Sequence, residues 1–69
     1  MNITFLGAGY VGATTTAHFS GPHQVSIYDP DTSKIDSIKE VIDGSNEFYI
    51  DEKGLVDKIK SNRDRLNPT

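Results

Sequence analysis

Two short, mostly apolar runs lie near the start of the chain. The runs Ile3-Thr4-Phe5-Leu6 and Val25-Ser26-Ile27-Tyr28 predict strands over residues 2–6 and 24–28. Between them, residues 10–20 fit a helix that Gly21-Pro22 ends. A strand, a helix and a second strand joined by short connections predict a parallel pair with a right-handed crossover.

The second half of the chain has a helical period. Ile35, Ile38 and Ile42 share one face of a helix predicted over residues 31–43, with Asp31-Thr32-Ser33 at its start and Gly44 at its end. Residues 45–51 then form a connection with Phe48-Tyr49-Ile50 as a docking cluster, and residues 52–62 form a third helix. Asn67-Pro68 ends this segment, so we expect two strands and about three helices, with the chain stopping where a third strand would begin.

A glycine pattern follows the first strand directly, as Gly7-Ala8-Gly9-Tyr10-Val11-Gly12. Gly7 permits a tight turn, Gly9 lets the backbone approach a pyrophosphate, and Gly12 lets the helix pack closely on the strand. The free N–H groups and the dipole of the helix favour an anion at this point. The layout predicts the first βαβ unit of a Rossmann-like dinucleotide-binding fold, of the α/β class.

Asp29 ends the second strand, 20 residues after Gly9. A carboxylate there can accept hydrogen bonds from both hydroxyls of an adenosine ribose and would repel a 2′-phosphate. No arginine follows it within thirty residues. The position therefore favours NAD over NADP.

Length limits what the chain can do alone. Its 69 residues are half or less of an ordinary domain, and a complete dinucleotide-binding sheet has about six strands. We therefore expect residues 1–69 to be the N-terminal part of one incomplete domain. A two-stranded parallel remnant leaves an edge open to another chain, which would favour a homo-oligomer.

Charge and composition narrow the classes of partner. All seven basic and all ten acidic residues lie from Asp29 onward, and the net charge of −3 argues against a nucleic-acid surface. There is no cysteine, and His18 and His23 lack ligand neighbours, so no metal site is expected. No apolar stretch long enough for a membrane span is present, and we expect a cytoplasmic protein.

Further residues match a pattern that is more specific than the general dinucleotide-binding glycine motif. The glycine loop, Asp29, Lys34-Ile35 and the segment Tyr49-Ile50-Asp51-Glu52-Lys53-Gly54-Leu55 together resemble the UDP-glucose/GDP-mannose dehydrogenase family across the whole chain. Glu52, Gly54 and Leu55 keep that family's pattern, whereas Tyr49 replaces the usual proline.

The resemblance implies roles for individual residues. The backbone at Tyr10 and Val11 would hold the pyrophosphate of NAD, Asp29 the adenosine ribose, and Lys34 would reach the adenosine end. Lys34 is equally compatible with an exposed lysine of the helix. For Glu52, which in the family lies near the cofactor cleft, a helix-capping role is favoured.

The family oxidises a sugar-nucleotide alcohol to a carboxylate in two NAD-dependent steps, through a thiohemiacetal on a cysteine. No catalytic residue of that reaction matches a position here, so the resemblance implies an NAD-binding segment that meets a sugar nucleotide only through a missing remainder. Two alternatives stay open: a stand-alone nucleotide-binding or self-associating βαβ module without catalysis, and a segment that keeps the fold but binds no nucleotide.

Overall fold

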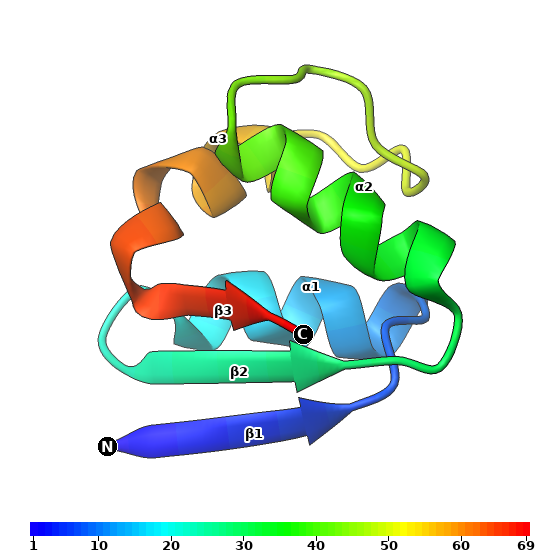
Figure 1. The fold of residues 1–69 in the computed structure, drawn as a ribbon. Coiled ribbons are helices and arrows are strands. Elements are labelled where there is room, and N and C mark those ends of the chain that lie inside the picture. Colours follow the sequence, from blue (N-terminus) through cyan, green and yellow to red (C-terminus); the bar gives the residue numbers. More distant parts are fainter.

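Three parallel strands form the sheet of the computed structural model, which describes all 69 residues. The strands are β1 (Asn2–Leu6), β2 (Gln24–Tyr28) and β3 (Leu66–Pro68), in the order β1-β2-β3 (Figure 1). Ile3 stands opposite Val25, and Val25 stands opposite Leu66. The central strand is therefore β2, and both β1 and β3 are edges.

Three helices pack against one face of this sheet: α1 (Tyr10–Phe19), α2 (Thr32–Ile42) and α3 (Leu55–Ser61) (Figure 1). Burial alternates along the strands accordingly. Val25 and Ile27 of β2 are buried beneath the helices, while Gln24 and Tyr28 on the opposite face are exposed. This opposite face carries no covering layer. None of the helices has both the length and the apolar character needed to cross a membrane.

The core lies between the sheet and the helices. Each helix contributes small or branched apolar side chains to it. Ile35 and Ile38 are buried as expected, but Val41 is buried with them in place of Ile42, which is half-buried. The buried cluster comprises Ala8, Ala17, Val25, Ile27, Ile35, Ile38, Val41, Leu55, Ile59 and Leu66.

The third strand corrects the expectation of two. Leu66–Pro68 pairs with β2, and the N–H of Thr69 donates to the carbonyl of Ile27 at 2.9 Å. Asn and Pro are both depleted in strands, and three residues give no readable alternation. Proline is tolerated here because β3 is an edge strand.

The third helix is shorter than the predicted 52–62. It begins only at Leu55, because Gly54 before it adopts φ +84°, a left-handed conformation that glycine accepts easily. It ends at Ser61 and is followed by a single 3₁₀ turn, Arg63–Arg65, that leads into β3.

Side chains from the segment between α3 and β3 cap the C-terminal end of α1. The buried Asn62 donates from Nδ2 to the carbonyl of Ala17 at 3.1 Å, and Arg65 donates from Nε to the carbonyl of Ser20 at 2.8 Å. These carbonyls are among the last of the helix, which have no intrahelical partner. Side chains 45 residues downstream thus satisfy them.

Candidate cofactor-binding site

The glycine loop turns sharply at the end of β1. Gly7 has φ +105°, which an L-residue adopts only under strain, and its N–H donates to the backbone of β2 at 2.7 Å. A Cβ on Gly12 would lie 2.0 Å from the carbonyl oxygen of Gly7. The two glycines together therefore allow the first turn of α1 to lie directly against the loop, as the motif predicts.

The N-terminus of α1 is suited to an anion. Gly9 is the N-cap residue, no side chain caps the helix, and the first turn contains no acidic residue. The first intrahelical bond from this end is the N–H of Ala13 to the carbonyl of Gly9, at 2.8 Å. The preceding N–H groups thus lack intrahelical partners. A Cβ built on Gly9 would meet nothing within 4 Å, so the space beside it is open to a pyrophosphate.

Asp29 lies beside this loop, and both of its carboxylate oxygens bind backbone. Oδ2 accepts from the N–H of Ala8 at 2.7 Å, and Oδ1 accepts from the N–H of Asp31 at 2.8 Å. These two hydrogen bonds, Ala8 first, lower the pKa of Asp29 below its usual value. Each oxygen retains a free lone pair, so the carboxylate can anchor the loop and still accept from a ribose hydroxyl.

Lys34 lies in the first turn of α2, and its positive charge contributes a small part of the lowering of the Asp29 pKa. The helix begins at a side-chain cap, in which Asp31 accepts from the N–H of Ser33 at 3.1 Å. The predicted contact of Lys34 with the adenosine end stays a prediction.

Two tyrosines join the glycine loop and α1 to the segment before α3. Tyr49 donates its hydroxyl to the carbonyl of Ala8 at 2.5 Å, and Tyr10 donates to Oε1 of Glu52 at 2.6 Å. The hydrogen bond to Glu52 raises the pKa of Tyr10, and burial, with the charges of Asp29 and Asp31, raises the pKa of Tyr49 to about 12.

Sequence reasoning missed both contacts. It favoured a helix-capping role for Glu52, and this expectation was wrong, because α3 has Gly54 as its N-cap and no side-chain cap. The only sequence signal at Tyr49 is that a hydroxyl-bearing ring replaces the proline of the family pattern. That signal marks a difference without saying what the ring contacts.

Comparison with known proteins decides the family. The family model described as "UDP-glucose/GDP-mannose dehydrogenase family, NAD binding domain" matches residues 1–69. The chain belongs to this family. The UDP-glucose/GDP-mannose dehydrogenase resemblance drawn from the motifs is therefore confirmed, and the cofactor of the domain is NAD.

A solved structure supports the same assignment. The chain is similar to the UDP-D-ManNAc dehydrogenase of Pyrococcus horikoshii, with 28% identity and a TM-score of 0.84 over 100% of this chain. It spans only 16% of that enzyme's length. A search of curated proteins found no match. The partial Rossmann-like α/β fold is confirmed.

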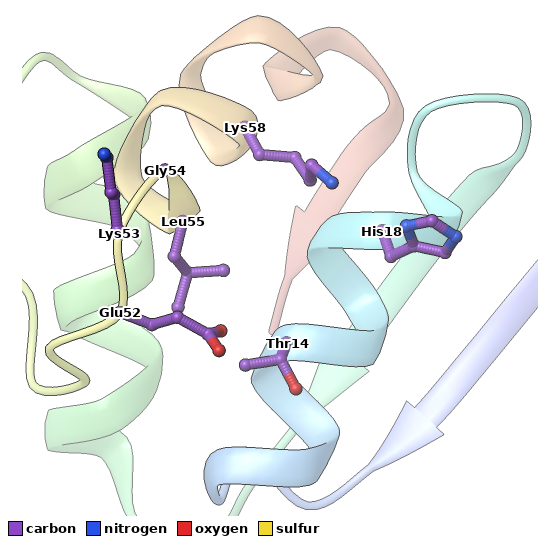
Figure 2. A pocket seen from close by; sticks show the side chains of 7 residues that line it. All are labelled: Thr14, His18, Glu52, Lys53, Gly54, Leu55 and Lys58. Carbon is purple, nitrogen blue, oxygen red and sulfur yellow. The ribbon is translucent and has the colours of Figure 1, made fainter.

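A separate hollow of about 280 Å³ lies between α1 and the start of α3 in this UDP-glucose/GDP-mannose dehydrogenase domain. Figure 2 shows Thr14 and Glu52 directed into it, with His18 and Lys58 at its far end. None of the predicted cofactor-binding residues lines it. The predicted site is instead the open surface formed by Gly7, Gly9, Tyr10, Val11, Gly12, Asp29 and Lys34, and the binding role of each stays a prediction.

Proposed function

We propose that this chain holds the adenosine diphosphate half of NAD, as the N-terminal part of a dehydrogenase that oxidises a sugar-nucleotide alcohol to a uronate. The observation that carries this proposal is the uncapped N-terminus of α1 lying against the Gly7 turn, with Asp29 anchored beside it. Family membership supports NAD as the ligand.

Different residues contact different parts of NAD. The free N–H groups at Tyr10 and Val11 donate to the pyrophosphate, and the helix dipole adds a favourable field. Asp29 accepts from the ribose hydroxyls and, as an anion, disfavours a 2′-phosphate. Bound NAD supplies the hydride acceptor.

The oxidation itself needs groups that this segment does not contain. A thiohemiacetal route requires a thiol, and the sequence has no cysteine. The similar UDP-D-ManNAc dehydrogenase is much longer than the matched region. The sugar nucleotide and the catalytic groups would therefore be held by a remainder of such an enzyme, outside these residues.

An NMR titration tests the binding step. Amide spectra of the ¹⁵N-labelled 69-residue chain are recorded as NAD is raised to several millimolar, since half a site binds weakly, at about 4 kcal/mol. We expect shifts confined to residues 7–13 and 29–34, and weaker binding of NADP. A dispersed spectrum that NAD leaves unchanged would refute the proposal.

A second proposal concerns self-association through β1. This edge strand carries no charge and no proline, its last residue Leu6 is 82% exposed, and Met1 directly before it is 84% exposed. Natural edge strands are ordinarily protected by charged residues or by proline, as Pro68 protects β3. As the alternative in which the chain acts as a stand-alone module, we propose that a second copy of it pairs with β1.

Sedimentation over a range of concentrations tests this pairing. Thr4→Lys places a charge on the exposed side of β1 and should shift the chain toward monomer, whereas Asn67→Lys places it on the opposite edge and should not. A native chain that stays monomeric at every concentration would contradict the proposal.

A further inference from the structure

Both backbone polar groups of Ala8 form hydrogen bonds to side chains. Its N–H donates to Asp29 Oδ2 at 2.7 Å, and its carbonyl accepts from the Tyr49 hydroxyl at 2.5 Å. The residue is fully buried, yet it stands between Gly7 and Gly9, which restrict backbone rotation least. Together with the hydrogen bond of the Gly7 N–H to the Tyr28 carbonyl, these two hydrogen bonds hold a loop whose glycines restrict its backbone little.

Tyr49 comes from a distant part of the chain, 41 residues after Ala8, in the connection between α2 and α3. Its ring packs on Phe48, with centroids 4.5 Å apart, and Phe48 in turn packs against the core. The Tyr10 hydrogen bond to Glu52 joins the same two segments a few residues further on. The phenol is thus supported from behind and directed at the loop.

We propose that Tyr49 is a positioning residue for NAD, fixing the glycine loop so that the N–H groups of α1 meet the pyrophosphate in one orientation. The inference rests on the proposed NAD site and adds to it a residue outside the motif. Tyr49 acts through Ala8 and does not itself hold the phosphates. Its single O–H is committed to the Ala8 carbonyl, so its contribution is preorganisation of the loop before ligand arrives.

The variant Tyr49→Phe tests this role, because it removes the hydroxyl and keeps the ring on Phe48. The matched control is Tyr28→Phe, which removes a hydroxyl from a half-exposed tyrosine on the uncovered sheet face. Affinities of the ¹⁵N,¹³C-labelled 69-residue chains for NAD, ADP and adenosine are measured by NMR titration. The carbonyl signal of Ala8 and the exchange rate of its N–H are recorded without ligand.

Loss of one hydrogen bond in Tyr49→Phe should weaken NAD and ADP about two- to tenfold. Adenosine lacks the pyrophosphate and should bind as in the native chain. The Ala8 carbonyl signal should move and its N–H should exchange faster, while Tyr28→Phe matches the native chain in every measurement. A general loss of stability would weaken all three ligands alike, so the ADP and adenosine comparison isolates the loop.

The outcomes separate the two proposals. A native chain that does not respond to NAD overturns the proposed function and this inference with it. A native chain that binds NAD, together with a Tyr49→Phe chain that binds NAD and ADP equally well or more tightly, overturns the inference alone. Equal weakening of adenosine and ADP also overturns it.

Discussion

Replacing Gly12 by alanine introduces one methyl group at the glycine where an added Cβ would have the closest neighbour. The added Cβ would lie 2.0 Å from the carbonyl oxygen of Gly7 and 3.0 Å from its carbonyl carbon. Both atoms are backbone, so neither can rotate away. Restoring a contact of about 3.4 Å requires the helix or the loop to move by about 1.4 Å.

The cost of that movement exceeds the gain in helix propensity. Overpacking costs about 1–3 kcal/mol and occasionally more, whereas Gly→Ala inside a helix gains about 1 kcal/mol. Because the clash is with fixed backbone, we expect a cost above that range, about 4 kcal/mol, and so a net loss of about 3 kcal/mol in the free energy of unfolding. A chain of this length has about 3–10 kcal/mol in total, so Tm should fall by about 12–24 °C.

Thermal and urea unfolding followed by far-UV circular dichroism measures the change. Gly9→Ala is the matched control, since its Cβ meets nothing within 4 Å and Gly9 already has φ −69°. We expect this control to lose less than about 1 kcal/mol, as a cap substitution, but to bind NAD more weakly because the methyl projects into the space beside the loop. A Gly12→Ala chain as stable as the native one would refute the close packing of loop and helix.

Three further predictions concern single side chains. Asn62→Ala removes the buried donor to Ala17 and should cost about 1–3 kcal/mol, measured as a fall in Tm; an unchanged Tm would contradict it. The pKa of Asp29 is lowered by folding, so its contribution to stability is present above its ordinary pKa and is lost as the pH falls through the lowered value. The urea midpoint of Asp29→Asn should therefore depend less on acid pH than that of the native chain. The pKa of Tyr49 is raised to about 12, so its contribution to stability is present below about pH 10 and is lost as the pH rises through 12. Tyr49→Phe should lack this alkaline loss of stability. Parallel curves of stability against pH for the two chains would count against it.

Local signals in the sequence predict the parts of the fold that local chemistry determines. Strands 2–6 and 24–28 appear with those bounds, and the turn at Gly7 and the close approach at Gly12 follow from the glycine spacing. Asp29 lies beside the loop because the carboxyl ends of adjacent parallel strands meet at one edge of a sheet. The glycine motif and the end of β2 are enough to locate the candidate site.

Contacts between distant segments were not predictable in this way. Strand β3 was missed because Asn67 and Pro68 oppose its conformation and only pairing with β2 creates it. The hydrogen bonds of Tyr49 and Tyr10 join residues 41 and 42 positions apart, and no periodicity encodes them. The sequence located Asp29 but did not show that its carboxylate also anchors the loop.

The all-parallel sheet also determines how the chain must fold. Its strand pairings join residues 22 positions apart between β1 and β2 and 41 positions apart between β2 and β3, and there is no hairpin from which the sheet could grow. Loop-closure entropy must be overcome before any of these contacts stabilises the chain, and high contact order slows folding. We therefore expect the helices to form and dissolve rapidly on their own, while the sheet assembles late and cooperatively, more slowly than in a hairpin-containing protein of the same length.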